Sequence, residues 1–457
     1  MLLFLGATVF RSLPSGDAVE NVYQASHWDL HDRAVFVGYF AMAAAVAQLL
    51  KFVGVQAIVA LGLMSGFFGA LLAVSTFRLA RHFGLTQEQG CLAAGVVVFS
   101  GVGWFFGTVA DTYIVHTSLV TLSQVWFWDR KFRRSGAMFG LAMLVYPSSV
   151  LLTLPFYLVL AVWKRVPLRS LLVTALFAAL VYLPSIALVY QEYFWGRMGI
   201  FVAGKNLGTK TIGDMSLVRF LGRGIYHLAG SLHLALPLAI LGFGRALVRE
   251  RILALIFLLL VPFPLWNHFL QPTYTDSYVI TLYPWIAVLA ALAAGPVLSR
   301  IPRASVRRTL LVGFALVYIT LSSAWWVTPL RHRADEFRSV ATEWIEESSA
   351  DDLLLASWGL AVACNYYSAG TLNSDRCVVF EWVTRPQLDF YLQGPGRVYL
   401  VDDKPIQTAL RSMRGGTGAE EHRPGSGLAW LEGISPDVGA SLERDGTFAI
   451  YRLEPPR

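Results

Sequence analysis

The sequence predicts a polytopic α-helical membrane protein that ends in a small α/β domain. Of its 457 residues, 55% are hydrophobic and only 15% are charged. Several stretches exceed the roughly eighteen consecutive apolar residues that mark a membrane helix. Short runs of basic residues separate these stretches, which is typical of the loops on the cytoplasmic side of a membrane.

The basic runs set the expected topology. They are Arg78/Arg81 and the stretches 129–134, 164–169, 245–251 and 299–308. Placing all of them inside puts the N-terminus inside and the chain from Ser15 onward outside. Because the net charge of +7 is distributed over these runs, no basic tail is left for a nucleic-acid partner.

Nine apolar stretches are expected to cross the membrane once each. They lie near 1–13, 55–77, 90–110, 113–128, 170–190, 226–244, 252–266, 278–298 and 310–327. The stretch 34–50 is expected to lie in the outer interface, because a crossing there would put Arg78 and Arg81 outside.

The stretch 137–163 lies between two basic runs that both belong inside, so a single crossing is excluded. We expect a bent pair of helices that turns at Tyr146–Pro147, where proline interrupts the helix. Its shorter arm, about 10 residues, is too short to cross alone. Counted as two, the pair brings the expected total to about eleven membrane segments.

The composition becomes polar after Pro329. Residues 1–330 are predicted to form the membrane domain and residues 331–457 an external α/β domain. Four runs have the pattern of short strands, set among helix-like stretches: 351–358, 376–383, 397–403 and 447–454.

The three cysteines differ in setting. Cys364 and Cys377 lie in the predicted external domain, where they would pair in an oxidising compartment and stay reduced in a reducing one. Cys91 lies in an apolar stretch and is expected to pack as a small hydrophobic residue.

An acidic pair follows the first helix. Asp17 and Glu20 have the spacing of an N-cap and its N3 partner, so this D-x-x-E pattern has an ordinary interpretation as the start of a helix. The pair also stands at the membrane edge with His31 nearby. Burial and neighbouring cations there would tune a carboxylate for general base catalysis. Both interpretations hold together if Glu20 serves the helix start and Asp17 faces a substrate.

A second external carboxylate, Asp111, precedes the helix that begins near Tyr113. Its ordinary role would be that helix's cap. The topology puts it at the same depth as Asp17, so we expect the two to converge on one external cavity. His116 follows one turn later, facing either the cavity or a packed, hydrogen-bonded interior.

Two other loops are predicted on the external side. The loop 191–225 contains five basic residues, which is unusual for an external loop under the positive-inside rule. They are Arg197, Lys205, Lys210, Arg219 and Arg223. We favour phosphate binding over contact with anionic lipid headgroups for them. The loop 267–278 supplies His268, Tyr274 and Asp276, either as cavity lining or as part of a plain connection.

In this order the pieces resemble the GT-C superfamily, polytopic glycosyltransferases that use polyprenyl-phosphate-linked sugars. The bacterial protein O-mannosyltransferase-like branch is the most similar. The matching features are Asp17-x-x-Glu20, His31 ahead of "GYF", "ADTYIVH" (110–116), "VYPSSVLLTLPFYLVL" (145–160) and "SYVITLYPWIAVLAALAAG" (277–295). The resemblance covers residues 1–330.

The resemblance implies that Asp17 is the catalytic base. It implies transfer of a sugar from a polyprenyl-phosphate donor to a hydroxyl of a protein, lipid or glycan, on the outer face of a bacterial inner membrane. Direct displacement would invert the anomeric carbon. Asp111 and Glu20 would orient substrate or bind a divalent cation, whose use differs within the superfamily. The alternatives are a flippase for a lipid-linked glycan and a glycan ligase of the O-antigen type that relies on the 191–225 loop.

Overall fold

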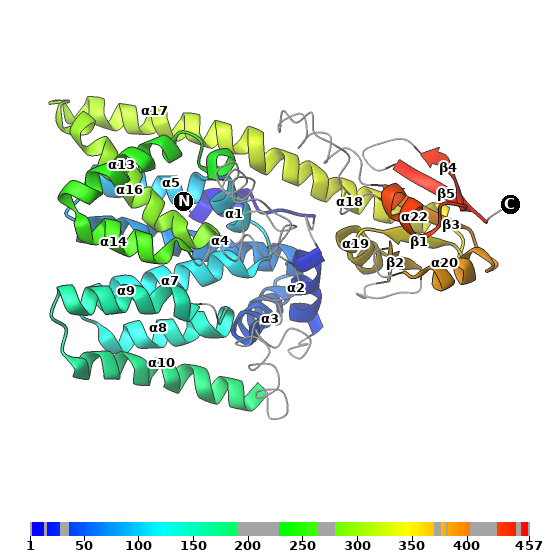
Figure 1. Cartoon of the computed structure of the whole chain (residues 1–457), viewed down its shortest axis with the longest axis horizontal. Helices are drawn as coiled ribbons and strands as arrows, with labels where there is room; N and C mark the ends of the chain where they lie inside the picture. The colour runs from blue at the N-terminus through cyan, green and yellow to red at the C-terminus, as the bar shows by residue number, and fades with distance from the viewer. Residues whose placement is uncertain are drawn as a thin grey trace. The chain divides into compact units, whose positions relative to one another are not determined.

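The computed structural model describes residues 2–12, 16–27, 36–147, 149–189, 228–262, 279–369, 376–380, 383–402, 427–444 and 449–455. The contacts within the chain divide it into two compact units (Figure 1). The first unit comprises Met1–Phe10 and Gln24–Pro329, and the second comprises Arg11–Tyr23 and Leu330–Arg457. The described part of the first unit is helical, and the described strands belong to the second.

The described part of the first unit consists of α-helices and short helical turns. They are α1 (Leu2–Ala7), α3 (Val37–Lys51), α4 (Ala57–His82), α5 (Gln87–Phe99), α6 (Gly101–Phe106), α7 (Thr112–Trp128), α8 (Phe132–Val145), α9 (Ser149–Trp163), α10 (Leu168–Val189), α13 (Ala235–Arg249), α14 (Arg251–Leu260), η3 (Val279–Leu282), α16 (Tyr283–Ser299), α17 (Ala304–Ser322) and η4 (Ser323–Val327). Helix α2 (Gly16–His27) has residues in both units.

Four described helices are long and apolar enough to cross a membrane. They span Ala57–His82, Leu168–Ser185, Val279–Ser299 and Ala304–His332. Shorter apolar helices cover Val37–Lys51, Leu152–Trp163 and Arg251–Leu260. These lengths and compositions support a multi-pass membrane protein, while the total of about eleven segments stays a prediction.

The expected span 90–110 is instead two helices, α5 and α6, that meet at Ser100. Ser100 is extended, and its hydroxyl accepts a hydrogen bond from the Gly103 amide at 3.1 Å, which caps α6. A Cβ atom on Gly103 would lie 1.9 Å from the Val97 carbonyl oxygen. The break therefore depends on glycine, because no other residue fits so close to the preceding helix.

The pair of helices expected over 137–163 is present as α8 and α9, and the chain turns at Tyr146 and Pro147 as predicted. Tyr146 is extended and ends α8. The first arm is longer than expected, with 14 residues. That is about 21 Å at ~1.5 Å per residue, which is still shorter than a hydrocarbon core of ~30 Å.

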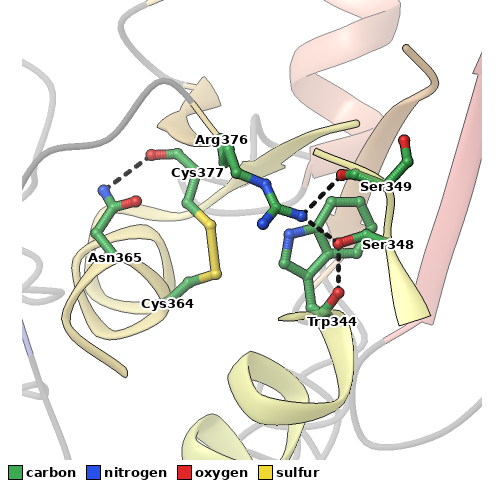
Figure 2. The surroundings of a disulfide bond; sticks show 7 residues. All are labelled: Trp344, Ser348, Ser349, Cys364, Asn365, Arg376 and Cys377. Carbon is green, nitrogen blue, oxygen red and sulfur yellow. Dashed lines mark hydrogen bonds between the residues drawn. A yellow bond between two sulfur atoms is a disulfide. The ribbon is translucent and has the colours of Figure 1, made fainter. Parts of the chain in front are cut away.

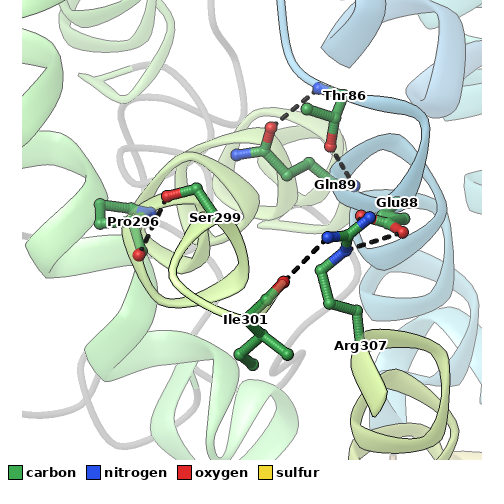
Figure 3. A network of polar contacts seen from close by, with 7 residues as sticks. All are labelled: Thr86, Glu88, Gln89, Pro296, Ser299, Ile301 and Arg307. Atoms are coloured by element: carbon green, nitrogen blue, oxygen red, sulfur yellow. Dashed lines mark hydrogen bonds and ion pairs between the residues drawn. The ribbon is translucent and has the colours of Figure 1, made fainter. Parts of the chain in front are cut away.

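Helices α5, α16 and α17 are joined by polar contacts at one end (Figure 3). The Thr86 and Gln89 side chains form a capping box at the start of α5. Arg307 of α17 donates to both oxygens of Glu88 at 2.9 and 3.1 Å, and to the Ile301 carbonyl at 2.9 Å. The Gln89 amide also donates to the Ala291 carbonyl of α16 at 3.1 Å. These bonds hold the basic stretch 299–308 against the start of α5.

The second unit contains a five-stranded sheet. Its strands are β1 (Leu353–Ala356), β2 (Cys377–Val379), β3 (Val398–Asp402), β4 (Gly439–Arg444) and β5 (Ala449–Glu454), in the order β2-β1-β3-β5-β4. Strand β1 is parallel to β2 and β3, whereas β5 is antiparallel to β3 and β4. Four strands lie in the runs predicted as strands. Strand β4 is additional, and its glycine, alanine, serine and glutamate are poor strand formers.

Helices cover both faces of this sheet. They are α18 (Thr328–Glu347), α19 (Trp358–Ala369), α20 (Arg385–Leu392) and α22 (Gly427–Ile434). Leu354 and Ala356 of β1 pack with α18 and α19, while Leu353 and Leu355 pack with α20 and α22. This alternation follows from the two-residue period of a strand, and it gives the predicted small α/β fold.

Helix α18 continues from the membrane helix without an interruption. The segments α17, η4 and α18 follow one another directly along the chain. Pro329 is therefore inside a continuous helix, directly after the π-helical turn η4, where the regular pattern of helical hydrogen bonds is already altered. The amino-acid composition becomes polar after Pro329, but the helix does not end there.

A short segment from the N-terminal part of the chain belongs to the second unit. The Ser12 hydroxyl donates to a carboxylate oxygen of Asp335 on α18 at 2.7 Å. The Ser12 side chain is buried. This bond fixes the segment that leads into α2 to the first helix of the C-terminal unit.

A disulfide joins Cys364 of α19 to Cys377 of β2 (Figure 2). The Asn365 amide donates to the Cys377 carbonyl at 3.0 Å, and the Arg376 guanidinium donates to the Ser348 hydroxyl at 2.6 Å. Of the two states left open by the sequence, the structure has the paired one. Cys91 is free, and it is exposed on the surface of α5, whereas the sequence predicted a small packing residue.

We expect one of the three cysteines to react with a maleimide-polymer reagent in the denatured, unreduced protein, and all three after reduction. The single adduct should disappear in Cys91→Ser.

Because the disulfide closes a loop of 13 residues, breaking it should cost the second unit about 3 kcal/mol of stability. Three adducts before reduction would contradict the pairing.

Candidate active site

Asp111 caps α7 and is almost fully buried. Its backbone is extended, and its carboxylate accepts a hydrogen bond from the Thr112 amide at 2.6 Å and from the Thr112 hydroxyl at 3.3 Å. Only 6% of the residue is exposed. The helix N-terminus stabilises a negative charge at this place. Asp111 is therefore the cap of α7. A carboxylate can also accept a hydrogen bond from a hydroxyl group or bind a cation.

Tyr39 of α3 lies within electrostatic reach of Asp111, which the sequence did not predict. It is fully buried, and the negative charge of Asp111 acts on its hydroxyl. Within the described part of the chain this hydroxyl has no hydrogen-bond partner. Buried hydroxyls are normally paired, and leaving one unpaired costs about 1–3 kcal/mol. The "GYF" motif contains Tyr39, but its pattern gave no sign that the hydroxyl would approach a carboxylate.

Aromatic rings gather where the start of α7 meets the α8–α9 turn. The Phe36 and Tyr146 rings are stacked with their centroids 5.2 Å apart, and the Tyr113 ring lies 6.1 Å from that of Tyr146. Tyr113 also contacts Phe106, at 5.3 Å. Ligand sites typically combine aromatic walls with a few polar groups, and the start of α7 and the α8–α9 turn supply both.

His116 is held by the start of α9. Its Nε2 atom lies 2.7 Å from the Ser149 hydroxyl oxygen, and that hydroxyl donates to the Tyr146 carbonyl at 2.7 Å. Because the single serine proton is used there, His116 donates from Nε2. The residue is 2% exposed. This geometry favours the packed, hydrogen-bonded alternative, in which His116 positions the turn that carries Tyr146.

The segment after α1 is bonded to the loop that leads to Asp111. The Phe10 amide donates to the Thr108 carbonyl at 3.1 Å, and the Trp104 indole donates to the Thr8 hydroxyl at 3.1 Å. A Cβ atom on Gly62 of α4 would lie 2.5 Å from a Val9 methyl group, so glycine permits this close approach. The two stretches that precede Asp17 and Asp111 are thus fastened together.

Asp17 and Glu20 both lie in α2, which agrees with a helix start at D-x-x-E. The helix begins at Gly16, so Asp17 is its second residue. The Asp17 side chain and the whole of His31 lie outside the described residues. So do eight other predicted site residues: Arg197, Lys205, Lys210, Arg219, Arg223, His268, Tyr274 and Asp276. The convergence of Asp17 and Asp111 stays a prediction.

The described residues contain no group of three or more His, Cys, Asp or Glu side chains close enough to hold a metal ion. Asp111 is a possible single ligand within that part of the chain. The divalent cation considered from the sequence therefore stays a prediction, and Asp111 and Glu20 are the residues assigned to it.

Together, the apolar helices and the small α/β unit define a multi-pass membrane protein whose helix ends carry a buried carboxylate among aromatic rings. No protein-family model matches the chain, and no curated protein sequence does. Solved structures do share its fold.

ArnT from Cupriavidus metallidurans in the apo state has a TM-score of 0.55 and 12% identity, over 98% of this chain and 95% of ArnT. The archaeal oligosaccharyltransferase AglB from Archaeoglobus fulgidus has a TM-score of 0.55 and 14% identity, over 97% of this chain and 71% of AglB. Both are GT-C superfamily glycosyltransferases. At these identities the likeness establishes the fold alone.

Proposed function

We propose that this protein is a membrane glycosyltransferase that takes its sugar from a polyprenyl-phosphate donor. The observation that carries the proposal is the GT-C-like fold over nearly the whole chain. An ArnT structure contains undecaprenyl phosphate, and the AglB structure contains dolichol-phosphate and an inhibitory peptide. Proteins of this fold thus bind a long lipid phosphate, and one of them also binds a peptide.

In the proposed reaction Asp17 removes the proton from an acceptor hydroxyl. The hydroxyl oxygen then forms a bond to the anomeric carbon of the sugar, while the bond from that carbon to the lipid phosphate oxygen breaks. The electron pair leaves with the phosphate. Because the hydroxyl oxygen attacks from the side opposite to the departing phosphate, the configuration at the anomeric carbon is inverted. A phosphate leaving group needs no proton at neutral pH, but it needs positive charge around it.

Other residues are assigned supporting roles. The basic residues of the loop 191–225 would neutralise the departing phosphate. Asp111 and Glu20 would orient the substrates, and a divalent cation would add charge to the same place if one is bound. Tyr39 is a candidate hydrogen-bond donor to the sugar or its acceptor, because its buried hydroxyl lies in the field of Asp111 and has no partner among the described residues.

The proposed orientation places the start of α7 outside and its end inside a bacterial inner membrane. The basic stretch 129–134 follows α7, and basic loops favour the cytoplasmic side. The disulfide of the C-terminal unit supports an external location for that unit, because disulfides persist in oxidising compartments. The donor phosphate and the acceptor would then meet at the outer surface.

Tyr39→Phe is expected to lower the rate of sugar transfer about three- to tenfold, the effect of losing one hydrogen bond to substrate. Stability should not fall and should rise, because the hydroxyl has no partner to lose among the described residues and its unpaired burial is costly. Tyr318→Phe is a matched control, since Tyr318 of α17 is also buried with a hydroxyl that lacks a described partner. Equal rates for both variants would remove Tyr39 from the site.

The proposal is tested with the purified protein in vesicles that contain a polyprenyl-phosphate sugar with a radioactive label. We expect the label to move into a membrane or soluble acceptor that is present on the outer side. Movement of the labelled lipid across the bilayer without a transfer product would identify a flippase instead. Loss of transfer in Arg223→Ala, with full transfer in Asp17→Asn, would indicate a ligase of the O-antigen type.

A further inference from the structure

Helices α8 and α10 lie side by side in the first unit and run in the same direction (Figure 1). A Cβ atom on Gly136 of α8 would lie 2.2 Å from the Thr174 carbonyl oxygen, and one on Gly140 would lie 2.6 Å from that of Ala178. The two contacts advance four residues along each helix, so the helices are parallel. Their small residues allow the backbones to meet closely. Both positive helix ends therefore lie at the same end of the unit.

A hollow of about 500 Å³ lies at these two helix starts. Its lining residues are Arg130, Lys131, Phe132, Arg133, Arg134, Arg169, Ser170 and Val173. We call this the α8–α10 hollow. Five of its residues are cationic, and no side chain caps the start of α8. Amide groups at a helix start together with arginine and lysine are the groups that bind phosphate.

The positive charge of the hollow is largely uncompensated. Asp129 lies beside it, but this carboxylate is shared by Arg78, by His82 at 2.9 Å and by Lys131 at 3.8 Å. Arg130, Arg134 and Arg169 have no acidic partner in the part of the chain that the structure describes. A cluster of like charges that is not neutralised within the protein favours a bound anion.

The backbone at Arg130 provides a matched comparison with a second arginine outside the hollow. Arg130 has a φ of 60°, a left-handed conformation that favours glycine at the end of a helix. A non-glycine residue is uncommon there and costs stability. Arg165, in the turn between α9 and α10, has the same conformation with a φ of 49°, but it does not line the hollow. Both positions can therefore be changed to glycine without backbone strain, and only Arg130 belongs to the hollow.

The surface next to the hollow is apolar. Leu168, Leu172, Leu176 and Leu180 of α10 are each more than half exposed, and their four-residue spacing puts them on one face. In a membrane helix such a face contacts acyl chains. The hollow thus places a phosphate site directly beside a surface for lipid chains.

We infer that the α8–α10 hollow binds the phosphate of an anionic phospholipid headgroup. The phosphate oxygens accept hydrogen bonds from the arginines and the first amides of α8, and the acyl chains lie along the leucines of α10. This site is separate from the candidate active site, because Asp111 lies at the opposite end of α7. Seventeen residues of helix correspond to about 25 Å at ~1.5 Å per residue. The inference therefore does not depend on the proposed function.

The test uses the purified full-length protein in detergent and counts bound lipids by native mass spectrometry. Phosphatidylglycerol, phosphatidylcholine and inorganic phosphate are titrated separately. We expect phosphatidylglycerol to bind more tightly than the other two. Arg130→Gly should weaken it about fivefold, and Arg130→Gly with Arg134→Gln about 25-fold, since each charge near an anionic lipid contributes about that factor.

Arg165→Gly is the matched control, because it removes the same charge and relieves the same backbone conformation outside the hollow. It should change phosphatidylglycerol binding less than about twofold. Since both substitutions introduce glycine where φ is positive, both variants should fold, which their melting temperatures will check. Equal weakening by the two variants, or equal binding of phosphatidylcholine, would overturn the site. Binding of inorganic phosphate as tight as that of the lipid would overturn the lipid assignment.

Discussion

Asp17→Asn is expected to lower sugar transfer about a hundred- to ten-thousand-fold, the contribution of a general base. Asparagine has nearly the same size as aspartate, but it cannot take the proton of the acceptor hydroxyl. It is also well tolerated at the start of a helix, where Asp17 stands in α2. The loss should therefore appear in kcat, measured with a labelled polyprenyl-phosphate sugar, while the amount of folded protein in the membrane stays the same.

Glu20→Gln is the matched control for this result, because it neutralises a carboxylate one turn later in the same helix. If Glu20 mainly serves the helix, this variant should keep most of the activity. A comparable loss in both variants would point to a shared electrostatic role and away from a single base. Full activity of Asp17→Asn would exclude Asp17 as the base altogether.

Asp111→Asn is the second substitution with a large expected effect, a fall in transfer of about ten- to a thousandfold. Asparagine caps a helix as well as aspartate does, so α7 should keep its start and its stability. What the variant removes is the negative charge that the structure buries beside Tyr39. Measuring the transfer rate and the melting temperature together will separate the effect of the negative charge from the effect of the helix cap.

Asp111→Ala completes the comparison, because alanine removes the cap as well as the charge. It should cost about 1 kcal/mol of stability in addition to the loss of activity. If Asp111 acts only as a cap, Asp111→Asn should behave like the unaltered protein and Asp111→Ala should be unstable. That outcome would remove Asp111 from the proposed active site.

Local patterns in the sequence predicted the parts of the fold that local chemistry decides. The turn at Tyr146–Pro147 followed from the proline, and four strands followed from short apolar runs. The start of α7 followed from Asp111, whose side chain is the cap. In each case the residues that determine the structure lie within a few positions of it.

The features that escaped prediction depend on contacts between distant parts of the chain. The break at Ser100 requires the close approach at Gly103, which hydropathy does not reveal. Strand β4 lies at the sheet edge, where its pairing with β5 outweighs its poor propensity. Tyr39 becomes a site candidate only because folding brings it within electrostatic reach of Asp111. Sequence periodicity assigns residues to faces, but it does not say which faces meet.

The bond between Ser12 and Asp335 has a consequence for how the protein is made. Its two residues are 323 positions apart, so at ~5–20 residues per second the ribosome needs roughly 16 to 65 seconds to reach the second after the first. During that time the helices of the first unit can enter the membrane, but the segment that leads to Asp17 has no α18 to bind. A nascent or truncated chain that stops at Ser322 would therefore have the helices of the first unit, but it would lack the hydrogen bond between Ser12 and Asp335. The order of synthesis thus delays the fastening of the segment that leads to Asp17 until α18 has emerged.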